Sequence, residues 1–284
     1  MGSSGNRPPR ATVIVATYEN PAALSLVFAG LARQTTPDFE IVVADDGSGD
    51  TTRDLVSTFA RGSRLLVHHT WHADEGLQKG RIVNRALLDA RSDYVIFLDG
   101  DCIPGPTFVQ AHLAIARPGA YLSGGCVLLS SDASHTLRPD LIENGALDGL
   151  RACRPGNRRS RRLAVFGIPP LSALLDRRFA RHPVGFHGGN ASTWRADLVE
   201  IGGFDERLRR FEDKDIGHRL RLRGFRGESV RYRIPTWHVH HERPYVDQAM
   251  RDESRALFEA NVASGERRTH HGLAPAVDAG TRAP

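Results

Sequence analysis

The chain has 284 residues, of which 40% are hydrophobic and 25% are charged, as in an ordinary globular protein. This composition excludes a wholly disordered chain and is sufficient for one large α/β domain or two small ones. The formal net charge of +5 is a mild basic excess, and the arginines cluster locally. We therefore expect no nucleic-acid partner.

The sequence also indicates the cellular compartment of the protein. Its three cysteines, Cys102, Cys126 and Cys153, are widely spaced and form neither a disulfide framework nor a zinc motif, which is typical of a reducing compartment. No stretch approaches the ~20 apolar residues of a membrane span, and residues 1–10 lack the apolar core of a signal peptide. We expect a cytoplasmic protein, with peripheral contact at the inner membrane face left open.

Strands and helices are predicted to alternate in the first part of the chain. The predicted strands are short apolar runs, at 11–16, 39–44, 65–68 and 93–98. Helical spacing of apolar residues follows the first three of them, at 20–34, from 50 onward and at about 77–90. Asn20 and Pro21 suit the cap and first turn of the first helix. This alternation predicts a parallel sheet with right-handed crossovers.

The pattern changes after Pro104. Helices are predicted at 107–116, 195–201, 212–223 and 245–262. Strands are predicted at 121–129 and 229–234. Residues 130–185 are expected to be irregular and are rich in arginine, and the polar segment from Ala263 is expected to be flexible.

Acidic pairs follow two of the predicted strands. Asp45 and Asp46 end the second strand, and Asp99-Gly100-Asp101 ends the fourth. Ligands of open parallel sheets bind beyond the carboxyl ends of the strands, and one intervening residue puts Asp99 and Asp101 on the same side. Two carboxylates with a glycine between them suit Mg²⁺ or Mn²⁺ held jointly with a diphosphate. The alternative is a plain Asp-Gly-Asp turn, which the upstream acidic pair disfavours.

The first half of the chain contains three motifs in order, VIVATYEN at 13–20, IVVADDGSGD at 41–50 and VIFLDGDCIP at 95–104. They resemble the nucleotide-binding half of the family 2 glycosyltransferases, which have the GT-A fold. The second half continues with GGNASTWRADLVEIGGFDE at 188–206 and FEDKDIGHRLRLRG at 211–224. These segments resemble the acceptor half of galactosyl- and N-acetylgalactosaminyl-type enzymes and of chondroitin-synthase-like polymerases. The resemblance spans roughly residues 11–245.

The resemblance implies an α/β GT-A fold, with a Rossmann-like, mostly parallel nucleotide-binding sheet, helices on both faces and a smaller acceptor-side subregion. Together with the composition of the two ends, it predicts a flexible leader at 1–10, one domain at 11–262 and a flexible tail at 263–284. Within the domain, residues 11–106 form the nucleotide-sugar-binding half, and residues 107–262 form the acceptor half with a basic insert at 130–185. The implied reaction moves a sugar from a UDP-hexose or UDP-N-acetylhexosamine to a hydroxyl of a glycan, lipid-linked or small-molecule acceptor.

The resemblance also assigns donor-side roles. Thr17, Tyr18 and Glu19 would surround the base and ribose, and either Asp45 or Asp46 would accept a hydrogen bond from the uracil N3–H. Asp99 and Asp101 match the family's Asp-x-Asp pair, which bridges the diphosphate and a Mn²⁺ or Mg²⁺ ion. Gly100 stands between them.

Further donor contacts would come from a helix start and a glycine loop. Gln78, Lys79 and Arg81 lie at the start of the third predicted helix, within reach of phosphate, although a solvated helix face is the alternative. Gly189 and Asn190 belong to a Gly-Gly-Asn loop that would line the donor sugar, since glycine lets backbone approach a ligand closely.

A general base is expected at the pair Glu212-Asp213, which matches the family's Glu-Asp motif. An inverting transfer needs a base to deprotonate the acceptor hydroxyl, and a helix N-terminus favours an ionised carboxylate there. We assign Asp213 as the base and Glu212 as a group that orients acceptor or donor sugar. The alternative is that these acids and Asp215 only favour the helix start and pair with Arg219.

Histidines after the last predicted strand offer a further metal ligand. Relatives often supply a histidine from this region, and His238 and His240 would share a face in extended backbone, with His241 pointing away. We expect His238, with His240 next, to join Asp99 and Asp101.

The arginine run from Arg151 to Arg162 is interpreted either as a solvated loop or as an acceptor-side loop that binds an anionic acceptor or a membrane surface. Two other enzyme classes fit less well. A sugar-nucleotide nucleotidyltransferase needs a glycine-rich, arginine-bearing loop where this chain has TYEN, and a dinucleotide-binding dehydrogenase needs a G-x-G-x-x-G motif, which is absent. A non-catalytic carbohydrate-binding relative stays open, as does the oligomeric state.

Overall fold

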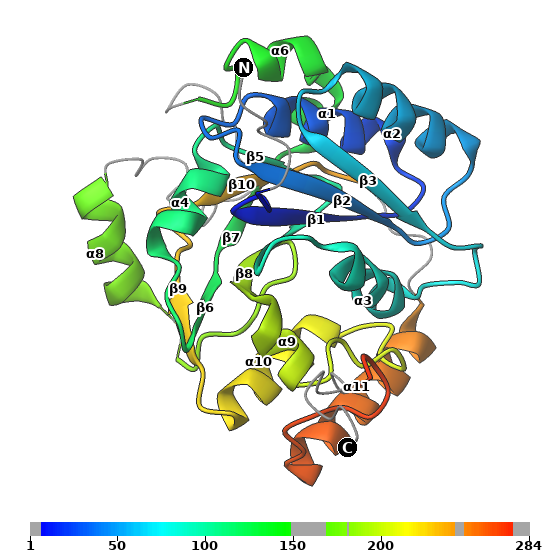
Figure 1. The fold of residues 1–284 in the computed structure, drawn as a ribbon, viewed down its shortest axis with the longest axis vertical. Coiled ribbons are helices and arrows are strands. Elements are labelled where there is room, and N and C mark those ends of the chain that lie inside the picture. The colour runs from blue at the N-terminus through cyan, green and yellow to red at the C-terminus, as the bar shows by residue number, and fades with distance from the viewer. Residues whose placement is uncertain (1–6, 149–168, 181, 242–246, 275–284) are drawn as a thin grey trace, which may run out of the picture.

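A seven-stranded mixed sheet forms the centre of the computed structural model, which describes residues 7–148, 169–180, 182–241 and 247–274 (Figure 1). Its strands are β1 Ala11–Thr17, β2 Phe39–Asp45, β3 Leu66–Trp71, β4 Tyr94–Asp99, β6 Ala120–Ser123, β8 Asn190–Trp194 and β9 Arg226–Ser229. The strand order is β3-β2-β1-β4-β8-β6-β9. The first four strands are parallel, whereas β8 runs antiparallel to both β4 and β6.

A smaller three-stranded sheet lies beside the first. It consists of β5 Cys102–Pro104, β10 Pro235–His238 and β7 Gly125–Leu128, with β10 in the middle. Strand β10 is antiparallel to β5 and parallel to β7, and its register places His238 opposite Cys102. Because Cys102 directly follows Asp101, this pairing brings a histidine from late in the chain next to the acidic end of β4.

Helices cover both faces of the large sheet (Figure 1). They are α1 Pro21–Ala32, α2 Asp50–Gly62, α3 Lys79–Asp89, α4 Phe108–Ile115, α5 Ser131–Thr136, α6 Pro139–Glu143, α8 Pro169–Phe179, α9 Arg195–Glu200, α10 Glu212–Leu222 and α11 Gln248–Ser264. Helices α1 and α2 lie over one face and α3 over the other, while α9, α10 and α11 gather at the opposite end of the molecule from α6. The structure is therefore the α/β sandwich of sheet and helices that the sequence predicts.

Alternation along β1 explains why its middle residues, Val13 to Val15, are all apolar. Val13 and Val15 belong to the hydrophobic core that contains Leu24 of α1, whereas Ile14 belongs to the second core, with Ile82 of α3. Successive side chains of a strand point to opposite faces, so a strand covered by helices on both sides buries every residue.

Two predicted strands differ from the structure. The run at 121–129 is divided at Gly124 into β6 and β7, which belong to different sheets; a Cβ at Gly124 would lie 2.4 Å from the Asn190 side chain. The strand predicted at 229–234 lies earlier in the structure, because β9 ends at Ser229 and residues 230–234 form the turn between β9 and β10. At 121–129 and at 230–234 the chain bends, and the apolar residues there are buried without forming one straight strand.

The segment at 130–185 contains α5, α6 and α8 and so is not wholly irregular, while Arg151 to Arg162 lie outside the described residues. The expected flexible tail also differs: α11 continues to Ser264, and residues up to 274 pack against the domain. Thr269 N–H donates to the Ile201 carbonyl at 3.0 Å, and Leu273 N–H to the Gly202 carbonyl at 2.7 Å. Residues 1–6 and 275–284 lie outside the description.

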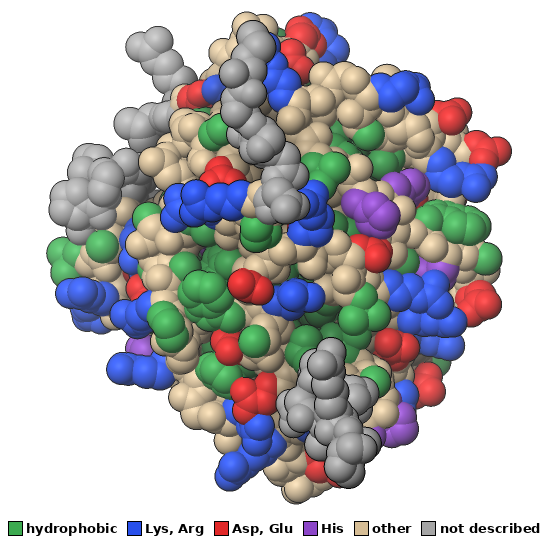
Figure 2. Space-filling model, in the orientation of Figure 1, with side chains coloured by type: hydrophobic (Ala, Val, Ile, Leu, Met, Phe, Trp, Pro, Cys, Tyr) green, Lys and Arg blue, Asp and Glu red, His purple; other side chains and the backbone are tan. Residues whose placement is uncertain are grey.

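The surface in the same orientation intersperses basic with acidic side chains, with hydrophobic side chains visible near the middle of this face (Figure 2). Within the described part of the chain, no helix combines the length and apolarity that crossing a bilayer requires.

Candidate active site

A cavity of about 920 Å³ opens at the carboxyl ends of β1 and β4. Much of its lining comes from five parts of the chain that are distant in sequence: 16–20, 99–102, 187–189, 209–214 and 238–241. Other positions add to it, among them Asp46, Lys79 and Arg251. Residues 16–20 and 99–102 follow the carboxyl ends of β1 and β4, which is where ligands of open α/β sheets bind.

Asp99, the last residue of β4, carries an ion pair inside this cavity. Lys79 Nζ lies 2.5 Å from Asp99 Oδ1 and 3.8 Å from Glu212 Oε1. Burial disfavours the charged form of Lys79, but the charges of Asp99 and Glu212 outweigh burial and raise the pKa of this ammonium above its usual range. Lys79 therefore stays a cation between the end of β4 and the start of α10.

Asp101 meets two imidazoles. The Asp101 Oδ2 atom lies 2.7 Å from His241 Nε2 and 3.3 Å from His238 Nε2, and the two rings stack with centroids 5.4 Å apart. Burial opposes ionisation of Asp101, but its hydrogen bonds with His238 and His241 outweigh burial and hold the pKa of this carboxyl well below its usual range.

These groups form a donor set that suits a divalent ion. One ligand atom from each of Asp101, His238 and His241 lies within 4.8 Å of the others, and the same holds for Asp99, Asp101 and Cys102. Carboxylate oxygens with imidazole nitrogens match Mn²⁺, and the two carboxylates alone match Mg²⁺.

The prediction of His240 as a ligand does not match this geometry. Strand β10 ends at His238, so the alternation that would turn His240 to the same face does not continue. Val239 N–H donates to the Asp101 carbonyl at 2.8 Å and His240 N–H to Ser134 Oγ at 2.8 Å, and the chain then brings His241 to Asp101. His240 is exposed at the cavity lining and lies outside both ligand clusters.

The end of β1 forms another wall, with Thr17, Tyr18 and Glu19. Tyr18 donates its hydroxyl to Asp74 at 3.0 Å. Glu19 has φ 44°, an uncommon conformation for a residue with a side chain, and is held there because its N–H donates to Ser48 Oγ and its carboxylate accepts from Gly49 N–H.

Of the acidic pair after β2, only Asp46 lines the cavity. It accepts the Gln78 N–H at 2.9 Å and lies 3.0 Å from His72 Nε2, and burial raises its pKa to about 6. Asp45 is fully buried and accepts a hydrogen bond from Ser48 N–H at 2.8 Å. Asp45 therefore stabilises the turn after β2, and Asp46 is the carboxylate of the pair that lies at the cavity.

Three predicted donor-side residues do not line the cavity. Gln78 precedes α3 as its N-cap residue, and Arg81 pairs with Glu75 at 3.0 Å. Asn190 is fully buried, and its side-chain amide donates to the carbonyls of Gly125 and Ile234 at 3.1 and 2.7 Å. Asn190 thereby connects β8 with residues at the small sheet, a structural role that motif matching does not reveal.

Two glycines allow close approach at the metal-ligand cluster. A Cβ at Gly189 would lie 2.6 Å from Asp99 Oδ2, and one at Gly100 would lie 2.9 Å from Thr17 Oγ1. Gly189 lines the cavity beside Gly188, where a Cβ would meet both Asp213 and Lys79 at ordinary contact distances. The glycine loop thus passes between the acidic end of β4 and the start of α10.

Glu212 and Asp213 begin α10 and both line the cavity. Phe211, directly before them, has φ 66°, a strained conformation for an aromatic residue that aims the first turn of α10 at the cavity. Burial raises the pKa of Glu212 to about 7, with Lys79 opposing the rise. Asp215, in contrast, is fully buried and pairs with Arg219 at 2.5 Å. Of the three acids, Asp215 therefore has the structural role, pairing with Arg219, that the sequence offered as the alternative.

Several lining residues were not identified from the sequence as site residues. Among the polar ones are His187, Arg209, Arg210, Lys214, His241 and Arg251. Lys214 follows the Glu-Asp motif directly, and that adjacency is the one local signal that could have found it. The others reach the cavity only through tertiary packing.

Comparison with known proteins agrees with this architecture. Residues 12–182 match the family described as Glycosyl transferase family 2. A validoxylamine A glucosyltransferase of Streptomyces hygroscopicus subsp. jinggangensis is 30% identical over 239 residues, covering 79% of this chain and 54% of that protein. A chondroitin synthase of Escherichia coli is 27% identical over 236 residues, covering 77% of this chain and 33% of that protein. The chain thus spans about half the length of the first of these relatives and a third of the second.

Solved structures are similar in fold. The mannosyltransferase PcManGT from Pyrobaculum calidifontis, in complex with GDP-Man and Mn²⁺, superposes with a TM-score of 0.59 at 21% identity, covering 91% of this chain and 65% of that one. S. aureus TarS 1–349, in complex with UDP-GlcNAc, gives a TM-score of 0.58 at 18% identity, covering 90% and 69%. The chain belongs to glycosyl transferase family 2 and has the GT-A fold.

Proposed function

We propose that the protein transfers a sugar from a nucleotide-sugar donor to an acceptor hydroxyl. The observation that supports this most directly is the juxtaposition, in one cavity, of the Asp99–Asp101 carboxylates with the Glu212–Asp213 pair, joined through Lys79. Family membership supports a transferase, and relatives and neighbours in fold are glycosyltransferases.

The nucleoside would bind at the wall formed by Thr17, Tyr18, Glu19 and Asp46. Asp46 is buried, directly follows β2 and lines the cavity, a position that suits the acceptor of a uracil N3–H. We propose a UDP-hexose or UDP-N-acetylhexosamine donor, with the sugar against Gly189.

A divalent ion, Mn²⁺ or Mg²⁺, would be held by Asp99, Asp101, His238 and His241. When bound, such an ion neutralises negative charge on the leaving diphosphate. Lys79 adds a second cation at the same place, and its raised pKa keeps it protonated at neutral pH. The donor set favours this proposal because it combines hard oxygen ligands with imidazole.

Asp213 would serve as the general base in a single inverting displacement. The acceptor oxygen bonds to the anomeric carbon while the bond from that carbon to the diphosphate oxygen breaks, and Asp213 takes the hydroxyl proton. Glu212 lies deeper than Asp213 and contacts Lys79, a position from which it would orient donor or acceptor sugar. We further propose that residues from 11 onward act as one catalytic domain, in which α11 belongs to the acceptor half.

A panel of UDP-sugars tests this function. The protein is incubated with each sugar and Mn²⁺, and slow release of UDP by hydrolysis is followed, with EDTA added in a parallel series. We expect one or a few donors to be hydrolysed and EDTA to abolish the reaction. UDP release that EDTA leaves unchanged would contradict the metal role, and release from no sugar nucleotide would contradict the function.

A further inference from the structure

The cavity has a basic side that the proposed reaction does not use. Four cationic side chains line it next to the candidate base: Arg209 and Arg210 before α10, Lys214 in its first turn and Arg251 in α11. Within the ranges that the structure describes, no ion pair joins any of the four to a carboxylate. We call these four residues the cationic rim.

Other charged groups of the cavity are paired or acidic. Lys79 is paired with Asp99, and the acids Asp101, Glu212 and Asp213 line the remaining wall. The cavity therefore has an acidic side at the sheet edge, which a divalent ion would neutralise, and a helical side on which the cationic rim flanks Glu212 and Asp213. Unpaired cations facing a cavity favour a ligand that brings its own negative charge.

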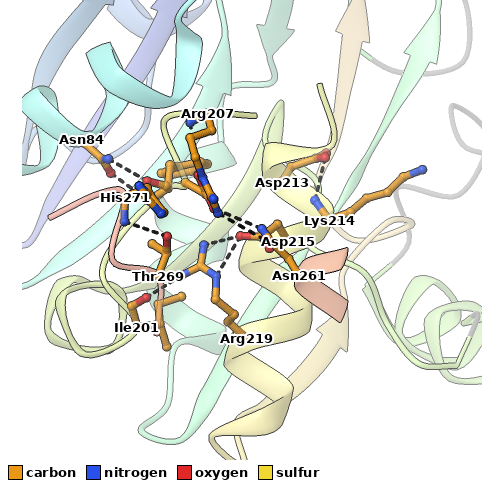
Figure 3. Close-up of polar contacts among 12 residues, drawn as sticks. Asn84, Ile201, Arg207, Asp213, Lys214, Asp215, Arg219, Asn261, Thr269 and His271 are labelled. Atoms are coloured by element: carbon orange, nitrogen blue, oxygen red, sulfur yellow. Dashed lines mark hydrogen bonds and ion pairs between the residues drawn. The ribbon is translucent and has the colours of Figure 1, made fainter. Parts of the chain in front are cut away.

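The rim stands on a rigid base formed by α10, α11 and the loop before α10 (Figure 3). Asp205 is fully buried and accepts two hydrogen bonds from Arg207, at 2.9 and 2.6 Å. The Asn261 amide of α11 donates to both Asp205 and Asp215, each at 3.1 Å. The stacking of Phe211 on Phe258 of α11, with ring centroids 6.0 Å apart, adds an apolar contact.

This base fixes where the rim cations sit. Arg209 and Arg210 follow Arg207 by two and three residues, Lys214 lies on the same turn of α10 as Asp215, and Arg251 lies on α11. Arg207 of this loop is paired with Asp205, whereas the four rim cations have no carboxylate partner among the described residues. Lys214 Nζ lies 4.5 Å from the centroid of the Phe211 ring, a contact that does not neutralise its charge. The base thus holds the backbone that carries the rim, while the side chains of Arg209, Lys214 and Arg251 are exposed and open to a ligand.

We propose that the acceptor carries a negative charge, as phosphate or carboxylate, which the cationic rim binds. This inference rests on the proposed function. The acceptor hydroxyl must reach Asp213, so the rest of the acceptor lies along the residues next to it, which include Lys214. The donor diphosphate has its own counter-charges at Asp99, in the form of the metal ion and Lys79. The rim also offsets the repulsion that Glu212 and Asp213 exert on an anionic acceptor.

Binding of three probe sugars tests the proposal. Glucose 6-phosphate, glucuronate and neutral glucose are titrated into the protein saturated with UDP and Mg²⁺, and binding is followed by ligand-observed NMR at low and high salt. We expect either charged sugar, or both, to bind at least about tenfold more tightly than glucose, with the difference shrinking as salt rises. The phosphate and carboxylate probes distinguish the two sources of charge.

The variants Lys214→Ala/Arg251→Ala and, independently, Arg209→Ala/Arg210→Ala should each lose most of this preference. The control is the variant Arg64→Ala/Arg177→Ala, which removes two exposed arginines away from the cavity and changes the net charge by the same amount. This variant should keep the preference for the charged sugars.

Three results would overturn the proposal: wild-type protein that binds glucose as tightly as the charged sugars, rim variants that keep the preference, or a control that loses it. A fourth result would also overturn the proposal. If the rim variants lose as much affinity for UDP as for the charged sugar, the rim binds the donor diphosphate and not the acceptor. The prior step of saturation with UDP and Mg²⁺ tests the proposed function separately. A protein that binds no UDP fails that step, whereas its preference among the three sugars can still be measured without metal.

Discussion

Replacing Arg219 with methionine should destabilise the protein strongly. Its guanidinium is 3% exposed, donates to Asp215 at 2.8 and 2.5 Å and to the Ile201 carbonyl at 2.5 Å, and the partner carboxylate is fully buried (Figure 3). Methionine fills similar volume but leaves Asp215 as a buried charge with Asn261 as its remaining hydrogen-bond donor. Removing one partner of a buried ion pair costs about 3–5 kcal/mol.

Urea unfolding followed by circular dichroism measures this loss. With a slope of about 1–3 kcal/mol per molar urea, a loss of 3 kcal/mol lowers the midpoint by about 1 M or more. The matched control is Arg223→Met, because Arg223 pairs with Glu200 from the same region but at the surface, with side chains 35% and 44% exposed. Such a pair contributes about 0–1 kcal/mol. Equal losses for the two variants would refute the reasoning that burial of the ion pair sets its energetic role.

Two further predictions concern the metal-ligand cluster. His241→Ala should weaken Mn²⁺-dependent UDP binding at least about tenfold, since it removes a neutral imidazole ligand, whereas His240→Ala should change it far less; calorimetry that ranks the two in the opposite order would contradict the donor set. Gly189→Ala places a Cβ 2.6 Å from Asp99 Oδ2 and should weaken the same metal-dependent UDP binding, while Gly185→Ala, with open space around it, should not. Equal affinities of the two glycine variants for UDP would show that Asp99 can move away from the added Cβ without weakening metal-dependent binding.

The strands of the nucleotide-binding half could be predicted because their signal is local. Strands β1, β2 and β4 are mostly apolar runs buried on both faces, whereas β3 is largely exposed. Asp46, Asp99 and Asp101 follow from the edge where the buried runs end. The division of 121–129 could not be predicted, since it depends on Gly124 meeting Asn190, a residue far along the chain.

Site residues that depend on distant partners were the hardest to predict. His240 was preferred over His241 on the assumption of continued strand geometry, but the backbone contacts of Val239 and His240 end that geometry. Asn190 lies in a motif yet satisfies buried carbonyls, and Arg81 pairs with Glu75 outside the cavity. In each case the local sequence is compatible with two side-chain directions, and tertiary contacts choose between them.

The most direct test of the account compares Asp213→Asn with Asp101→Asn in UDP binding and in turnover. A positioned base contributes on the order of 10²–10⁴-fold in rate, so kcat of Asp213→Asn should fall by at least about a hundredfold while its UDP affinity stays close to wild type. Asp101→Asn should lose turnover and also weaken metal-linked UDP binding, because a carboxylate ligand is gone. If Asp213→Asn keeps most of its turnover, or weakens UDP binding as much as Asp101→Asn does, Asp213 is not the base.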